Sequence, residues 1–411
     1  MKRFVSILAA LALCLCLAAP AAADAAPASL KFNKPEGATD GTFKIIQVAD
    51  PQDFILSCQI TQDFIYDLAK TEKPDLFVLT GDNVSTGGAS KLPKFLAKAL
   101  VWLSVQNLMH VFDRVYKEFG IPMTMVYGNH DNEAGPSKVS REEQFEMYKK
   151  HKCFLGYYDA DADGGTEDEQ GQHYGTHKLA IKNSAGDADA FNIWMFDSGS
   201  YDIGGGYSCV QQPQVDWFNS ANTARLPSIA FQHIIVKEIW DILEDAAQGD
   251  PGAIPRKITV DGEEVTTYIK LPDAPNVTGG LREVPGPGGR NFGQYQALCD
   301  GGVLALFVGH DHVNTYQFKY TDKTDLVNSP CTGFGSYGDI DLRGARIITL
   351  KESDLTTYET SLVSFQTFYY FTGHPLRDAR LKMYQSMGTP ATLLDWLSFK
   401  PLLWVLGLFD K

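Results

Sequence analysis

Short polar segments that directly follow apolar runs of strand length constrain this chain more than any other feature of its sequence. Four of them are Asp50-Pro51-Gln52, Gly81-Asp82-Asn83, Gly128-Asn129-His130-Asp131 and Gly309-His310-Asp311-His312, and a fifth run ends at His233. The carboxyl ends of strands in an open α/β sheet meet at a common crevice, so residues far apart in sequence can share one site there. Carboxylate, imidazole and amide groups together suit iron, zinc or manganese better than calcium. The sequence therefore predicts a metal site at the strand ends.

Apolar runs and helical patterns alternate around these segments. Strands are predicted over residues 43–49, 76–80, 122–127, 178–181, 191–196, 229–232 and 303–308. Helices are predicted over residues 58–70, 92–119, 214–221 and 234–246. Because strands that alternate with helices favour parallel pairing, we expect an α/β arrangement.

The first 23 residues have the composition of a signal peptide. Lys2 and Arg3 precede an almost wholly apolar run, and small residues at 21–23 offer a cleavage site near Ala23. The run is shorter than the roughly 20 apolar residues that a membrane span needs. Export is expected, to the periplasm, the cell surface or the medium; a lipoprotein, which Cys14 or Cys16 would allow, is the less favoured alternative.

The chain without this segment is strongly acidic. Its 36 Lys and Arg residues less Lys2 and Arg3, against 50 Asp and Glu residues, give a net charge of −16. Such a charge repels nucleic acid at long range, so no nucleic-acid partner is expected. It also repels a phosphate ester, unless bound metal ions concentrate positive charge locally.

The cysteine content indicates few or no disulfides. Five cysteines remain after residue 23, and no pair has the C-x-x-C spacing of a zinc or redox site. An odd number leaves at least one thiol free. We expect mostly buried free cysteines with at most one bridge.

The metal motifs run from residue 50 to residue 312, which favours one elaborated domain over residues 24–350. Residues 247–292 contain many Gly and Pro and little periodicity, so an insertion or lid is expected there. Residues 351–411 form a C-terminal extension that is expected to pack on the domain. Its last part, residues 393–409, is rich in Leu, Trp and Phe, and weak contact with a membrane surface is the alternative to docking.

The order and wording of the motifs resemble those of the calcineurin-like metallophosphoesterases. Residues 192–199, 214–218, 231–233, 309–314 and 333–335 look like segments of the purple-acid-phosphatase-like branch with a single catalytic domain. The resemblance covers residues 43–350. It implies an α/β (α+β) fold, a four-layer α/β/β/α sandwich with two mixed sheets flanked by helices.

The same resemblance implies a role for each motif residue. Asp50, Gln52 and His312 would bind a first metal ion, and Asn129, His233 and His310 a second. Asp82 would bridge the two ions, whose identity (iron, manganese or zinc) stays open. A hydroxide held between the metals would attack the phosphorus, and His130 would act as the general acid. Asp131 would orient His130.

Two positions depart from the family pattern. Gln52 stands where most members carry a His, so the first metal is expected to bind less tightly or to differ in identity. Ser85 stands where the coloured purple acid phosphatases have a Tyr ligand, so no purple charge-transfer band is expected from that ligand.

The resemblance thus implies an exported, dimetal-dependent enzyme that hydrolyses phosphate monoesters of small molecules or proteins. A phosphodiesterase built on the same metal core is one alternative. A surface or binding protein that keeps the fold without catalysis is the other, and Gln52 together with the aromatic tail motivates it.

Overall fold

The computed structural model describes residues 29–52, 59–157, 172–202 and 204–372. Its first sheet has the strand order β15-β14-β1-β2-β3. The strands are β1 (Thr42–Val48), β2 (Leu76–Thr80), β3 (Met123–Val126), β14 (Gly344–Lys351) and β15 (Asp354–Ser364). Strands β1, β2 and β3 are parallel, whereas β14 and β15 are antiparallel additions. The carboxyl ends of β1, β2 and β3 therefore lie at one edge.

The second sheet has the order β10-β12-β13-β11-β6-β5-β4. Its strands are β4 (His177–Lys182), β5 (Asp189–Met195), β6 (Ser228–Phe231), β10 (Val277–Thr278), β11 (Val303–Val308), β12 (Gln317–Phe318) and β13 (Asp325–Asn328). The central strands β5, β6, β11 and β13 are parallel to one another. The antiparallel pairs are β4 with β5, β12 with β13, and β10 with β12. Both sheets are therefore mixed, as predicted.

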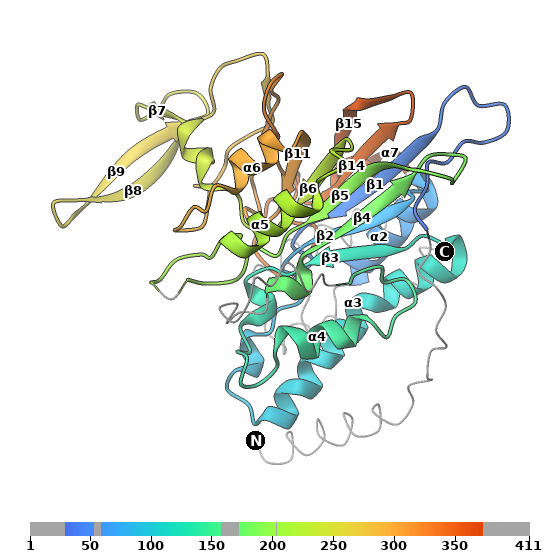
Figure 1. Cartoon of the computed structure of the whole chain (residues 1–411). Helices are drawn as coiled ribbons and strands as arrows, with labels where there is room; N and C mark the ends of the chain where they lie inside the picture. The colour runs from blue at the N-terminus through green and yellow to red at the C-terminus, as the bar shows by residue number, and fades with distance from the viewer. Residues whose placement is uncertain (1–28, 53–58, 158–171, 203, 373–411) are drawn as a thin grey trace.

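Alternation of side chains along the strands separates the core into layers. Ile45 and Val78 of the first sheet pack with Ile193 and Phe307 of the second in a core between the sheets. The outer face of the first sheet packs against α2 (Gln59–Glu72), α3 (Lys94–Phe119) and α4 (Arg141–Tyr148), and that of the second against α5 (Gln212–Ala221) and α6 (Gln294–Asp300). Figure 1 shows the two helical layers on opposite sides of the sheets. The predicted four-layer sandwich is confirmed.

Helix α3 is the longest described helix, and its ends follow from its sequence. Pro93 occupies the N-cap position, and Gly120 ends the helix in the left-handed conformation with φ 73°. By length and composition it is the one helix of the described residues that could cross a membrane. Its buried residues, including Val105 and Phe112, belong to the core beneath the first sheet, as expected for a core helix.

The prediction of a helix over residues 234–246 is wrong. A short 3-10 helix (Lys237–Asp241) is followed by strand β7 (Glu244–Ala246), which pairs with β9 (Glu263–Lys270). Buried Ile235 and Ile239 have helical spacing, but pairing with a distant strand overrides the local pattern. The predicted insertion, residues 247–292, contains β8 (Ile254–Val260) and β9, a hairpin that projects from the sandwich (Figure 1).

The domain end expected at residue 350 falls inside the β14–β15 hairpin, so the sandwich continues beyond it. Strand β15 leads into α7 (Phe365–Thr372), where Phe365 stacks on Phe64 of α2 with ring centroids 4.0 Å apart. This first part of the C-terminal extension packs on the domain. Residues 393–409 lie outside the described residues.

The four cysteines of the described residues, Cys153, Cys209, Cys299 and Cys331, are all free. Cys58 lies outside the described residues. The sequence predicts mostly buried free cysteines; Cys153 and Cys331 are buried, whereas Cys209 and Cys299 are half-buried.

Candidate metal centre

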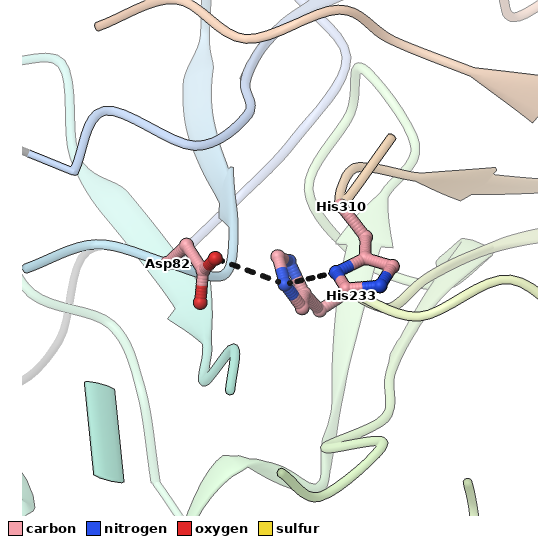
Figure 2. Close-up of side chains that lie close together, drawn as sticks. All are labelled: Asp82, His233 and His310. Atoms are coloured by element: carbon pink, nitrogen blue, oxygen red, sulfur yellow. Dashed lines mark hydrogen bonds and ion pairs between the residues drawn. The ribbon is translucent and has the colours of Figure 1, made fainter. Parts of the chain in front are cut away.

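The structure brings the predicted metal ligands together from both sheets. Asp50, Asp82 and Asn129 follow β1, β2 and β3 of the first sheet, while His233 follows β6 and the His310 turn follows β11 of the second. Figure 2 shows Asp82, His233 and His310 in contact, with the His233 ring between the other two side chains. Each parallel strand thus delivers its polar residue to the same edge of the sandwich.

The backbone at these positions is unusual. Asp50, Gln52, Asp82 and His310 have positive φ values of 49°, 35°, 48° and 69°. Non-glycine residues rarely adopt this left-handed region, and residues held there cluster at functional sites. The sharp turns lie at the edge of the sandwich where the strands of the two sheets end.

The glycines of the motifs allow the strand ends to approach closely. A Cβ at Gly128 would lie 2.2 Å from the backbone nitrogen and Oδ1 of Asp82, and one at Gly309 would lie 2.6 Å from Oδ2 of Asp50. Neither position could therefore carry a side chain without moving a carboxylate. The two glycines therefore let the backbone pass close beside a predicted ligand.

Hydrogen bonds fix the orientation of two imidazoles. His233 Nδ1 donates to the carbonyl of Thr80 (2.8 Å), and His312 Nδ1 donates to the carbonyl of Tyr337 (2.9 Å). When these rings are neutral, each Nε2 atom has a lone pair that faces the centre, which is the usual arrangement of metal-binding histidines. His310 faces the centre through Nδ1, 3.2 Å from His233 Nε2.

The ligand atoms form two groups that share Asp82. One group is Asp82, His233 and His310, and the other is Asp50, Asp82 and His312; within each, the ligand atoms lie within 4.8 Å of one another. Asn129 Oδ1 lies 3.1 Å from His233 Nε2, beside the first of these groups. The division matches the two ligand sets that the family resemblance implies.

An unpaired atom shows that this donor set fits metal ions. Asp50 Oδ1 is buried and accepts no hydrogen bond, while His312 Nε2 lies 3.3 Å away. A buried carboxylate oxygen without a donor is costly unless a cation neutralises it. The mixture of carboxylate, imidazole and amide groups suits iron, zinc or manganese.

Gln52 contacts the shared carboxylate. Its Nε2 donates to Asp82 Oδ2 (2.7 Å), and Oε1 is the amide atom that would be a metal ligand. In this orientation Gln52 holds the Asp82 carboxylate. A half-turn of the amide group would exchange Nε2 and Oε1 and bring the oxygen to the centre.

The charges of the cluster shift the imidazoles in opposite directions. Burial lowers the pKa of His233, but the nearby Asp82 and Asp50 outweigh it and raise that pKa to about 9. Burial and the neighbouring His233 hold the pKa of His310 well below its usual range. Metal ligation requires neutral imidazoles, so binding of metal would release a proton from His233 at neutral pH.

His130 lies at the solvent-facing side of the centre. Its Nδ1 pairs with Glu133 Oε1 (2.8 Å), and its Nε2 lies 3.9 Å from Asp82 Oδ2. Burial lowers the pKa of His130, but the hydrogen bond to Glu133 and the charge of Asp82 outweigh it and raise the pKa overall. A proton on Nε2 would therefore face the centre.

The prediction that Asp131 orients His130 is wrong. The Asp131 carboxylate accepts hydrogen bonds from the backbone N–H groups of Asn83 (3.1 Å), Val84 (2.9 Å) and Gly128 (2.8 Å). Asp131 therefore ties the β2 turn to the β3 turn, and Glu133 is the partner of His130. Burial raises the pKa of Asp131 to about 7.

Several residues around the centre were missed from the sequence. Tyr207 packs edge-to-face on His310 (4.2 Å between centroids), and Tyr337 stacks on His312 (4.1 Å). Glu283, at the end of the predicted insertion, accepts from the backbone N–H of Val313 (2.9 Å). Glu133, three positions after His130, carried a local signal, whereas the tyrosines lie in loops without any pattern.

Comparison with known proteins identifies the protein family of this chain. A family model described as calcineurin-like phosphoesterase matches residues 43–314. The chain belongs to this family.

Particular relatives are plant proteins. The chain is 22% identical over 312 residues to "Probable inactive purple acid phosphatase 28" of Arabidopsis thaliana, covering 67% of each chain. It is 26% identical over 373 residues to "Probable inactive purple acid phosphatase 14" of the same plant, covering 84% of this chain and 82% of the relative. A solved dimetal phosphatase from Danio rerio is 10% identical, with a TM-score of 0.42 over 79% of this chain and 99% of its own.

Proposed function

We propose that this chain is an exported, dimetal-dependent phosphoesterase that hydrolyses phosphate monoesters. The observation that carries the proposal is the pair of ligand groups that share Asp82, with His130 Nε2 facing the same carboxylate. A site kept only for packing would need neither two ligand groups nor a proton donor beside them.

The residues of the chain divide the chemistry between them. When bound, two metal ions lower the pKa of water and neutralise the charge of a phosphate ester. Asp50 and Asp82 would supply negative charge to the ions, and Asn129 and the three imidazoles would supply neutral donors. As water oxygen bonds to phosphorus and the ester P–O bond breaks, His130 Nε2 gives its proton to the leaving oxygen.

Preference for monoesters is supported by the relatives, whose names describe them as acid phosphatases. Small-molecule or protein phosphomonoesters are the proposed substrates. A net charge of −14 for the whole chain makes nucleic acid the less favoured substrate.

The test is hydrolysis of p-nitrophenyl phosphate beside bis-p-nitrophenyl phosphate, after removal of metal and reloading with manganese, zinc or iron. Metal-dependent hydrolysis of the monoester is expected. Faster hydrolysis of the diester would replace the proposal with a phosphodiesterase on the same core.

A non-catalytic binding protein is the second candidate, because the names of the plant relatives describe them as inactive. Gln52, where most family members carry His, points in the same direction. Metal analysis of the purified chain separates the two proposals. Protein that retains no metal and hydrolyses neither substrate would favour the binding protein, whereas two bound ions with turnover would exclude it.

Export is proposed from the signal-peptide composition of residues 1–23. Mass spectrometry of the chain recovered from cells tests it. A new N-terminus near Asp24 is expected, and an intact Met1 would contradict it.

A further inference from the structure

Three hydrogen bonds join the predicted metal ligand Asn129 to the proton donor His130 through two residues of no assigned role. Asn129 Nδ2 donates to the Tyr201 hydroxyl (3.0 Å), which donates to Glu133 Oε1 (3.1 Å), and the same oxygen pairs with His130 Nδ1 (2.8 Å). We propose that Tyr201 and Glu133 are positioning residues that fix the Asn129 amide and the His130 ring for their separate tasks. This inference deepens the proposed function and rests on it.

We call the four residues Asn129, Tyr201, Glu133 and His130 the circuit, and their chemistry fixes which group donates in each hydrogen bond. An ionised carboxylate can only accept, so both the Tyr201 hydroxyl and His130 Nδ1 must donate to Glu133. The Tyr201 oxygen is then left as an acceptor, and the Asn129 atom that faces it must be the amino nitrogen. Asn129 Oδ1 consequently points the other way, toward His233 Nε2 at 3.1 Å. Without the tyrosine hydroxyl, nothing in this circuit distinguishes the two ends of the amide.

The same circuit sets the tautomer of His130. In the protonated ring Nδ1–H donates to Glu133, so Nε2–H is the proton that faces Asp82 and the centre, and its loss leaves the tautomer with the proton on Nδ1. Partners of this kind outside the ligand set orient metal ligands and commonly cost 10- to 100-fold in affinity or activity when removed.

The Glu133 carboxylate packs closely against Gly87. A Cβ at Gly87 would lie 2.6 Å from Glu133 Oε2, so any side chain at position 87 would displace the carboxylate. Gly87 belongs to the short 3-10 helix after the β2 turn (Gly87–Ala89), so the two strand ends that supply Asp82 and Asn129 also enclose Glu133.

If these residues had only a structural role, replacing them would change the stability little, because the circuit lies near the surface. The side chains of His130 and Glu133 are 37% and 27% exposed, and Tyr201 is 44% exposed. Hydrogen bonds in such places add little to stability. Changes in metal affinity or in dependence on the leaving group would therefore report positioning rather than folding.

The first experiment titrates the metal-free full chain with Mn²⁺ in a calorimeter, comparing wild type with Tyr201→Phe. The substitution removes only the hydroxyl and keeps the ring that stacks on Tyr207. Binding at one of the two sites is expected to weaken by about 10- to 100-fold. Unchanged binding of both ions would overturn the role of Tyr201, whether or not the wild type hydrolyses any ester. A wild type that binds two ions but turns over no substrate defeats the proposed function alone.

The second experiment compares Glu133→Gln on phenyl phosphate and on p-nitrophenyl phosphate, which has the easier leaving group. Hydrolysis of phenyl phosphate is expected to slow by about 10- to 100-fold, and that of p-nitrophenyl phosphate by much less, because only a poor leaving group depends on the proton of His130. Equal slowing of both would overturn the role of Glu133. Gly87→Ala, which crowds the carboxylate without removing it, should reproduce the unequal slowing.

Matched controls come from a second Tyr–Glu pair remote from the centre. The Tyr66 hydroxyl on α2 donates to Glu118 of α3. Tyr66→Phe and Glu118→Gln should leave both Mn²⁺ binding and the ratio of the two rates as in wild type. Thermal unfolding of all variants separates a folding defect from a loss of positioning.

Discussion

The Asp82 carboxylate meets three partners at once. Its Oδ1 accepts from the backbone N–H of His130 (2.8 Å), and its Oδ2 accepts from Gln52 Nε2 (2.7 Å) and lies 3.4 Å from His233 Nε2. Asp82→Asn keeps the shape of the side chain but removes the charge that both ligand groups share. Turnover is expected to fall by about 10²- to 10³-fold, the scale of losing a main electrostatic contributor. Assays of metal-loaded variant and wild type measure it, and near wild-type activity would contradict the dimetal assignment.

His233 makes the stability of the metal-free protein depend on pH. Its pKa is about 9 in the folded chain, against an ordinary value of 6.5. Between these pH values the folded state binds more protons than the unfolded state. The resulting stability, on the order of 3 kcal/mol, is fully present below pH 6.5 and is lost as pH rises through 9.

Urea unfolding of the chelated protein at pH 6 and pH 9 measures this effect. His233→Gln, which cannot be protonated, is the matched control and should show a flatter dependence. A wild-type midpoint that rises with pH would contradict the prediction.

At the level of single residues, the sequence predicted the chemistry better than the contacts. Asp50, Asp82, Asn129, His233, His310 and His312 converge because each follows a strand of one layer or the other. Asp131 lies within the short 3-10 helix His130–Asn132 and Glu133 directly follows it, and only the three-dimensional course of that turn decides which carboxylate faces the His130 ring. Spacing within a turn does not contain that information.

Among the elements, the turns after β2 and β3 are packed without room for a single added carbon. Gly128→Ala would place Cβ 2.2 Å from Asp82, so the two turns must separate. Such overpacking typically costs about 1–3 kcal/mol, and the displaced Asp82 should also weaken metal binding. Thermal unfolding and Mn²⁺ titration check both effects.

Gly204→Ala is the control for Gly128→Ala. Gly204 has no neighbour within 4 Å of its added Cβ and no positive φ. The stability and the metal affinity of the Gly204→Ala variant should match those of the wild type. Equal behaviour of the two variants would show that the β2 and β3 turns are not closely packed.

The C-terminal hairpin supplies an edge of the first sheet. Truncation after residue 350 removes β15 and α7, leaving β14 paired with β1 alone and exposing Phe64, which Phe365 covers. The shortened chain is expected not to fold, because deletion of a buried Phe alone typically costs about 3–5 kcal/mol. Circular dichroism and solubility measure it. A cooperative thermal transition in this truncated chain would show that the domain does end at residue 350.

Strands were easier to predict than the segments around them. Buried strands such as β2 and β11 have continuous apolar runs with sharp ends, and the predicted bounds agree with the structure. Residues 234–246 mislead because Ile235 and Ile239 are buried at helical spacing, although one lies before the short 3-10 helix and the other within it, and the strand β7 that follows is largely exposed. The partner of β7 lies in β9, so no local pattern could reveal it.

For the whole molecule, the centre joins two sheets that otherwise meet mainly through apolar contacts. A small polar network lies beside it, where Gln47 Nε2 of β1 donates to the carbonyl of Val308 (3.1 Å) and Ser329 Oγ donates to Gln47 Oε1 (2.7 Å). Metal ions that bind residues of both sheets should therefore stabilise the folded state as a unit.

Removal of metal should lower the unfolding temperature of the full chain. A ligand present at 100 times its dissociation constant stabilises the folded state by about 2.7 kcal/mol. Calorimetric scans with Mn²⁺ and with a chelator measure the difference. Asp82→Asn should show little response to Mn²⁺, and an equal response in wild type and variant would place the metal elsewhere.

The division of the ligands between two sheets also has a consequence for the order of events in the cell. Asp50 emerges from the ribosome long before His312, and neither ligand group is complete until β11 and the turn that follows it have been made and the two sheets have met. The chain therefore cannot acquire its ions during early synthesis. Under the proposed export, the metals available where folding is completed, rather than those at the site of translation, would decide which ions the protein carries.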